Sequence, residues 1–174
     1  MQTAFTHDPR PHRAGRLLWV VLGVATAVVI LDQISKWMIV AWLKPVGSVD
    51  VIGGFLRFVY VENPGAAFSI GINFTWIFSV IAVIVAVVII RTSRKLGSVA
   101  WAIALGALLG GSLGNLCDRL FRPPGFGRGY VVDFIAFPHC AVFNVADIAI
   151  TCSAAFMVIL ALRGVSFSGA SVKG

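Results

Sequence analysis

Two aspartates in the last third of the sequence, Asp133 and Asp147, have the chemistry of an acid–base pair. Asp133 lies in the apolar run Tyr130–Ile135, where loss of solvent favours the protonated carboxyl and raises its pKa. When the surroundings keep one carboxyl protonated and the other ionised, one group can activate water while the other hydrogen-bonds a peptide carbonyl. If the fold brings the two groups together, they have the chemistry to hydrolyse a peptide bond without a metal.

Asp147 follows Asn144 at the spacing of a helix N-terminus. Asn144 can serve as the N-cap and Asp147 as the acid three positions later, so capping explains both residues without catalysis. The positive end of the helix dipole also stabilises a carboxylate, which makes Asp147 the candidate base. Positions 133 and 147 are fourteen apart, so the pair requires residues 134–143 to fold back.

Other charged residues lie in or beside apolar segments, where a charge at the helix centre costs at least about 2.5 kcal/mol on insertion scales. Asp32 and Lys36 are four apart in the favourable order for an ion pair on one helix face, which is either structural or part of a polar site. Asn115, Asp118 and Arg119 share the face of a helix's last turn. Arg119 there also complements the negative end of the helix dipole, an equally good explanation.

The elements that must hold these residues are membrane helices. Of the 174 residues, 59% are hydrophobic and only 12% are charged, a composition typical of a membrane protein. Four apolar stretches are each long enough to span a hydrocarbon core about 30 Å thick. We predict helices near residues 16–38, 73–91, 98–120 and 144–163.

The third predicted helix carries a glycine at every fourth position, Gly106, Gly110 and Gly114, with Gly111 beside them. Such a ridge without side chains lets another helix approach closely. Between the first two helices, the Gly53–Gly54 pair separates two β-branched and aromatic runs, which predicts a β-hairpin. The fold class is therefore an all-α polytopic membrane protein of four transmembrane helices, with a small extracytoplasmic β-hairpin or sheet.

We expect one four-helix peptidase domain over residues 16–163, with the surface β segment at 46–70. Residues 1–15 and 164–174 are expected to be disordered tails. The first helix resembles a secretory signal peptide, but no small-residue cleavage site follows it, so we expect it to be retained. Basic residues flank both tails and the link at 91–95, which predicts both termini in the cytoplasm and the polar residues toward the outer face.

The net charge of +7 is better explained by membrane topology than by a nucleic-acid partner. The histidines are scattered and form no HExxH motif, so no metal or other cofactor is expected. The three cysteines lack metal-ligand spacing and are interpreted as buried apolar residues without a disulfide framework. They are Cys117, Cys140 and Cys152.

Taken together, five blocks in order resemble the lipoprotein signal peptidases, also called signal peptidase II. The blocks are Asp32–Lys36, Asn63–Ser69, Gly110–Leu120, Val131–Ile135 and Phe143–Asp147. Each block alone is a weak signal, whereas five in sequence order are specific. The link at 119–131 is longer and the connection at 133–147 shorter than is usual in this family, which affects the expected geometry around the aspartates.

The resemblance implies an inner-membrane aspartyl peptidase of bacteria that removes signal peptides from prolipoproteins, cutting before a diacylglyceryl-modified cysteine. It implies membrane lipid and globomycin-type inhibitors as further partners. The catalytic pair falls on Asp133 and Asp147. The substrate-binding or supporting positions fall on Asn63, Gly65, Asn115, Arg119, Asn144, Asp32, Lys36 and Asp118.

Two other functions are compatible with parts of the sequence. A small transporter or channel subunit could use Asp32, Lys36, Asp118 and Asp147 as a polar relay, although the acids gather toward one face. A Ser-Lys peptidase could use Ser35 or Ser69 with Lys36, although Ser35 and Lys36 point apart on a helix. Asp118 is also a rival to Asp133 as the catalytic acid; its alternative role is an ion pair with a neighbouring arginine.

Overall fold

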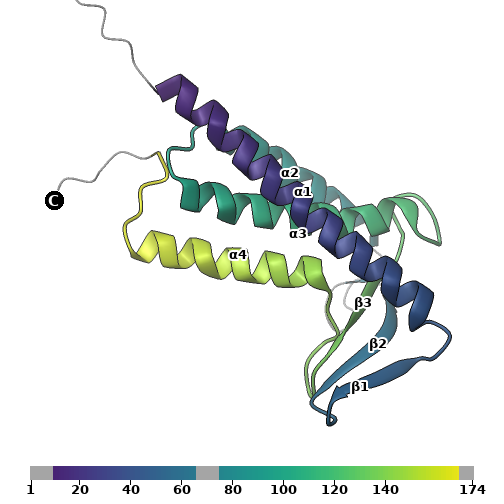
Figure 1. Cartoon of the computed structure of the whole chain (residues 1–174). Coiled ribbons are helices and arrows are strands. Elements are labelled where there is room, and N and C mark those ends of the chain that lie inside the picture. Colours follow the sequence, from purple (N-terminus) through teal and green to yellow (C-terminus); the bar gives the residue numbers. More distant parts are fainter. Residues whose placement is uncertain (1–9, 66–74, 169–174) are drawn as a thin grey trace, which may run out of the picture.

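The computed structural model describes the backbone of residues 10–65 and 75–168, and the side chains from residue 15 onward within these ranges. Four helices and three strands follow one another along this part of the chain (Figure 1). The helices are α1 Arg10–Trp42, α2 Thr75–Ser93, α3 Val99–Phe121 and α4 Val145–Leu162, and the strands are β1 Ser48–Ile52, β2 Leu56–Asn63 and β3 Val131–Ala136.

All four predicted helices are present and each is long and apolar enough to cross a membrane. Three of them end within two residues of the predicted bounds, whereas α1 is longer at both ends, from Arg10 to Trp42. Residues 10–15, which the sequence assigned to the N-terminal tail, are therefore helical, and residues 1–9 lie outside the described part of the chain.

The glycine ridge of α3 packs against the other helices, as predicted. A Cβ atom at Gly110 would lie 2.7 Å from the carbonyl oxygen of Ala25 in α1, and one at Gly111 would lie 2.5 Å from the carbonyl oxygen of Ala146 in α4. Side chains at these positions would push both neighbouring helices away. Because α3 touches α1 and α4 through glycine, the polar residues near its C-terminal end reach both helices.

A three-stranded antiparallel sheet in the order β1-β2-β3 lies at one end of the bundle (Figure 1). The predicted hairpin is correct: β1 pairs with β2, and Gly53 and Gly54 take positive φ angles of 37° and 73° in the turn. The third strand was missed, because its apolar run carries no turn signal linking it to the hairpin. The part of the predicted β segment at 66–70 lies outside the described residues.

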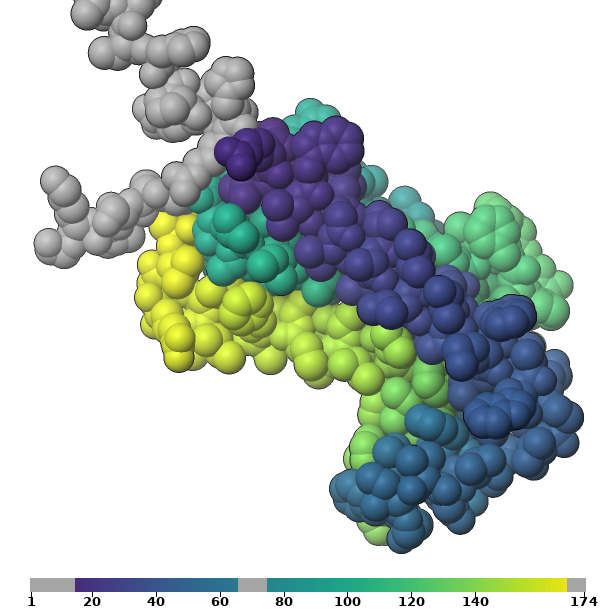
Figure 2. Space-filling model, viewed as in Figure 1, coloured from purple at the N-terminus to yellow at the C-terminus, as the bar shows by residue number. Residues whose placement is uncertain are grey.

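The sheet is anchored to the C-terminal half of α1. Ile39 of α1 and Leu43, the residue just after the end of α1, form a buried cluster with Val132 and Phe134 of β3. A second apolar cluster, farther along the bundle, joins α1 to α2 and α3. In the space-filling view the sheet projects beyond the N-terminal end of α4 and leaves a recess between them (Figure 2). Packing thus fixes β3 relative to α1, and Val145 at the start of α4 packs against the same cluster.

Two expectations about the rest of the chain are corrected. The start of the predicted C-terminal tail packs on α3, because the Trp101 indole donates a hydrogen bond to the carbonyl of Val165 (2.9 Å) and its ring contacts Phe167 edge to face. All three cysteines are free, but Cys140 and Cys152 are exposed and only Cys117 is partly buried. The exposure of Cys152 follows from its position on the outer surface of an apolar helix, where lipid can replace protein as its neighbour.

Candidate active site

The N-terminus of α4 holds Asp147 as the sequence predicts. The side-chain oxygen of Asn144 accepts a hydrogen bond from the Asp147 backbone N–H (3.0 Å), and Asp147 Oδ2 accepts one from the Asn144 backbone N–H (3.2 Å). This reciprocal capping box satisfies two backbone donors that a helix start leaves free. The cap also fixes the Asn144 amide, since its oxygen faces the helix and its nitrogen must point away from it.

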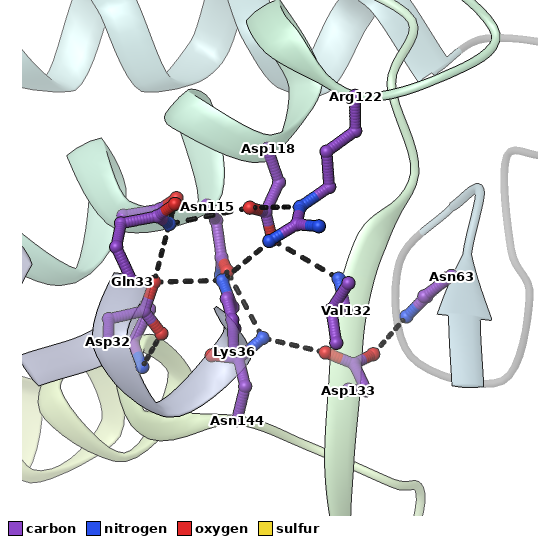
Figure 3. A network of polar contacts seen from close by, with 12 residues as sticks. Asp32, Gln33, Lys36, Asn63, Asn115, Asp118, Arg122, Val132, Asp133 and Asn144 are labelled. Atoms are coloured by element: carbon purple, nitrogen blue, oxygen red, sulfur yellow. Dashed lines mark hydrogen bonds and ion pairs between the residues drawn. The ribbon is translucent and has the colours of Figure 1, made fainter. Parts of the chain in front are cut away.

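Asp133 is buried in β3, with only 2% of its surface exposed. Asn144 Nδ2 donates a hydrogen bond to its Oδ1 atom (2.6 Å), and Asn63 Nδ2 at the end of β2 donates to its Oδ2 atom (2.8 Å; Figure 3). Burial raises the pKa of Asp133 to about 6, against the lowering effect of the Asn63 hydrogen bond, and the charge of Asp147 raises it further. The expected desolvation of this aspartate is confirmed.

The two aspartates belong to one hydrogen-bonded chain. Asn144 Nδ2, which contacts Asp133, also donates to Asn115 Oδ1 (3.1 Å), and Asn115 Nδ2 donates to Asp147 Oδ1 (2.8 Å). Residues 134–143 make the necessary return, because Phe143 pairs with Ile135 and brings the chain back to the start of α4. The short connection between the aspartates is therefore sufficient.

Arg119, in the last turn of α3, faces the same region. Its Nη2 atom donates to the carbonyl of Gly65 (2.8 Å), and Gly65 N donates to Asn63 Oδ1 (3.0 Å). Its guanidinium lies 5.0 Å from the ring centre of Phe78 in α2. The Nη1 atom is buried and has no hydrogen-bond partner among the described residues. A buried guanidinium nitrogen without a partner is costly, so this donor is available for a bound acceptor.

The predicted Asp32–Lys36 ion pair is present and extends to α3. Lys36 Nζ lies 2.9 Å from Asp32 Oδ2 and 2.9 Å from Asp118 Oδ2, and all three side chains are fully buried. Asp118 Oδ1 also accepts a 2.7 Å charged hydrogen bond from Arg122 Nε. Asp118 thus makes the predicted ion pair with a nearby arginine, and its carboxylate is occupied on both sides.

Two contributors to this region were missed as site residues. Gln33 Nε2 donates to Asp32 Oδ2 (3.1 Å), to Asp118 Oδ1 (3.3 Å) and to the Gly114 carbonyl (3.0 Å). Arg122 completes the charge balance. Gln33 stands next to Asp32 in an apolar segment, and Arg122 lies four residues after Asp118, the spacing of an ion pair on one helix face. These were the available signals.

The positions of these side chains bear on the two rival functions. Ser35 donates its hydroxyl proton to the Asp32 carbonyl oxygen (2.8 Å), and the Lys36 ammonium faces the two carboxylates, so they do not form a nucleophile and base. Ser69 lies outside the described residues. The four residues of the proposed relay belong to one local network: Lys36 pairs with Asp32 and Asp118, and Asn115 joins Lys36 to Asp147. Among the described residues these contacts form a cluster and not a path of charges across the helices.

A family model described as signal peptidase (SPase) II matches residues 24–163 of this chain. The chain is 52% identical to the lipoprotein signal peptidase of Streptomyces coelicolor over 161 residues, covering 92% of this chain and 79% of the relative. It is 43% identical to the lipoprotein signal peptidase of Mycobacterium tuberculosis over 160 residues, covering 92% and 79% of the two chains.

Two solved structures, each described as a bacterial membrane enzyme, have the same fold. One superposes with a TM-score of 0.75 at 29% identity and covers 88% of this chain and 93% of its own length. The other has a TM-score of 0.71 at 30% identity and covers 82% of this chain and 92% of its own length. With the family match over four helices and the polar site, these likenesses lead to one conclusion: the chain belongs to the signal peptidase II family, the lipoprotein signal peptidases.

Proposed function

We propose that this chain is a membrane aspartic endopeptidase that removes signal peptides from diacylglyceryl-modified prolipoproteins by cutting immediately before the lipidated cysteine. The family supports the coarser activity, cleavage of signal peptides from prolipoproteins, in a multi-pass bacterial membrane protein. One observation supports the aspartic mechanism most strongly: the hydrogen-bonded chain Asp133–Asn144–Asn115–Asp147 joins two carboxyl groups from different elements.

The two carboxyl groups divide the acid and base roles. Asp147, at the positive end of the α4 dipole, takes a proton from the attacking water. Asp133, whose pKa is raised to about 6 by burial, donates a proton to the oxygen of the scissile carbonyl. In the second half of the reaction the roles reverse. Asp147 gives the proton it took from water to the leaving amine, and Asp133 takes a proton back from a hydroxyl of the tetrahedral intermediate, so the amide bond breaks and the carbonyl re-forms without a covalent enzyme intermediate.

Arg119 and the asparagines bind the extended peptide around the scissile bond. The Arg119 Nη1 donor, which has no partner among the described residues, is suited to a substrate carbonyl oxygen beside the aspartates. Gly65, whose carbonyl is held by Arg119 and whose N–H is held by Asn63, supports this donor and places no side chain beside it. Polar pairing of the substrate backbone is needed here because an unpaired peptide group near hydrocarbon is costly.

The substrate's signal helix and lipid tails stay in the bilayer, and only the scissile peptide enters the polar site. The glycine ridge of α3, a candidate surface for the signal helix, packs against α1 and α4 and is not free for this purpose. The basic flanks of both termini favour the cytoplasmic side for them and the outer side for the active site. Globomycin-type inhibitors are expected to compete for the same polar site.

The proposal is tested with purified protein and a lipidated prolipoprotein. The variants Asp133→Asn and Asp147→Asn should each lose cleavage by at least about 1,000-fold, because a general acid or base contributes 10²–10⁴-fold and the two act together. Ser35→Ala, which removes the rival nucleophile, should cleave like the unmodified protein. Full cleavage by either aspartate variant would refute the assignment, as would loss of cleavage in Ser35→Ala alone.

A further inference from the structure

The buried ammonium group of Lys36 is the point at which several elements of the site meet. Its side chain is 0% exposed. Its Nζ atom contacts Asp32 Oδ2, Asp118 Oδ2 and Asn115 Oδ1, each at 2.9 Å (Figure 3). An ammonium group has three protons, so these three acceptors satisfy it completely. None of the steps proposed above uses this lysine.

Each carboxylate on Lys36 also holds the backbone next to one of the two catalytic aspartates. Asp118 Oδ2 accepts a hydrogen bond from the backbone N–H of Val132 (3.1 Å), the residue before Asp133. Asp32 Oδ1 accepts one from the backbone N–H of Ala146 (2.9 Å), the residue before Asp147. The backbone of β3 beside Asp133 and the backbone of α4 beside Asp147 are therefore each hydrogen-bonded to a carboxylate that pairs with Lys36.

The third acceptor links Lys36 to the catalytic pair through a side chain. Asn115 Oδ1 accepts hydrogen bonds from Lys36 Nζ and from Asn144 Nδ2, so Asn115 Nδ2 must face Asp147 Oδ1. A flipped Asn115 amide would place its NH₂ group against the ammonium and its oxygen against the Asp147 carboxylate. The positive charge of Lys36 thus selects the amide orientation that donates to the candidate base.

We infer that Lys36 is a positioning residue: by bridging Asp32 and Asp118 it sets the spacing and orientation of the two carboxyl groups, Asp133 and Asp147. The inference rests on the proposed aspartic mechanism and adds to it the residues that keep Asp133 and Asp147 at a fixed separation. The local charges are balanced, with Arg122 on the outer side of Asp118. Gly114 leaves room for this arrangement, since a Cβ atom there would lie 2.6 Å from Asp32 Oδ2.

The fold does not depend on this cluster alone. A separate apolar cluster joins α1, α2 and α3 away from the polar site, and Ile39 and Leu43 hold the sheet on α1. Variants of Lys36 can therefore keep the bundle while losing the spacing between the catalytic elements. A misplacement of about 1 Å at reacting groups costs about 100-fold in rate.

The test compares three variants of the full chain in lipid. Lys36→Met removes the bridge and leaves two carboxylates facing each other. Asp32→Asn combined with Lys36→Met removes that repulsion, and the new amide oxygen can still accept from Ala146 N. Lys44→Met is the matched control, because Lys44 is exposed and its nearest carboxylate, that of Glu62, is 3.5 Å away.

We expect the double variant to have a higher Tm than Lys36→Met. Its kcat should stay about 100-fold below that of the unmodified protein, and its KM should differ from that of the unmodified protein by less than about threefold. Lys44→Met should keep its kcat. A purely structural role predicts instead that kcat recovers together with Tm, and that result would overturn the inference. If Lys36→Met does not accumulate, the kcat of the double variant is compared directly with that of the control Lys44→Met.

The outcome is separable from that of the proposed mechanism. If Asp133→Asn and Asp147→Asn lose cleavage but the double variant has a normal kcat, the positioning role of Lys36 is refuted. The aspartic mechanism is then still supported. Cleavage retained by both aspartate variants would overturn both proposals.

Discussion

Removing the Asn63 amide should move the alkaline limit of activity to higher pH. The acid role of Asp133 requires its protonated form, and burial sets its pKa at about 6 in the free enzyme. The limb of kcat/KM above this value should therefore fall about tenfold per pH unit, to about one hundredth of the plateau at pH 8. The Asn63 Nδ2 hydrogen bond of 2.8 Å stabilises the charged form and lowers the pKa.

The size of the change follows from that single contact. A hydrogen bond to a charged group contributes about 1.5–3 kcal/mol, and one pKa unit corresponds to about 1.4 kcal/mol. Asn63→Ala should thus raise the pKa of Asp133 by about one to two units. Near pH 8 the variant should retain about a tenth or more of its own plateau, although the plateau itself is lower because Asn63 also fixes Gly65.

The assay is the pH profile of kcat/KM for cleavage of a lipidated prolipoprotein, normalised to each variant's plateau. Glu62→Gln is the control, because Glu62 is the neighbouring residue of β2 and its exposed side chain pairs with Lys44 and Tyr60, away from Asp133. Its limb should coincide with that of the unmodified protein. A limb for Asn63→Ala that stays in place or moves to lower pH would refute the reasoning, and activity that rises through pH 6 would exclude the acid role of Asp133.

Two further predictions concern packing. Gly110→Ala should lower Tm, because its Cβ atom would lie 2.7 Å from a backbone carbonyl of α1 and overpacking costs about 1–3 kcal/mol. The control Gly23→Ala, whose Cβ atom would have nothing within 4 Å, should keep or raise Tm in the same detergent. Equal shifts in Tm for the two variants would contradict the close approach of α1 and α3. Trp101→Phe should expose the C-terminal segment to faster proteolysis at unchanged kcat, because it loses the hydrogen bond to Val165, worth about 1 kcal/mol; unchanged proteolysis would mean that this bond does not hold the segment.

The sequence determined most of what depends on neighbours along the chain. Hydrophobic length predicted four helices, the spacing of glycines predicted a close-packed ridge on α3, and the Asn144–Asp147 spacing predicted a capping box. Each of these depends only on residues that are close together along the chain. The Asp32–Lys36 pair belongs to the same class, because residues four apart on a helix must lie on one face.

The tertiary structure decided which distant groups meet. Asp118 and Asp133 are both acids near the same surface, and the sequence favoured Asp133 as the catalytic acid while leaving Asp118 as a rival. In the folded chain Asp118 is occupied by Lys36 and Arg122, whereas Asp133 faces two amide donors and the asparagine chain that leads to Asp147. The Lys36–Asp118 pair arises from the packing of α1 on α3, and the contacts of Asp133 arise from the pairing of β3 with β2 and the approach of α4 to α3. These contacts join segments far apart in sequence, which no local pattern encodes.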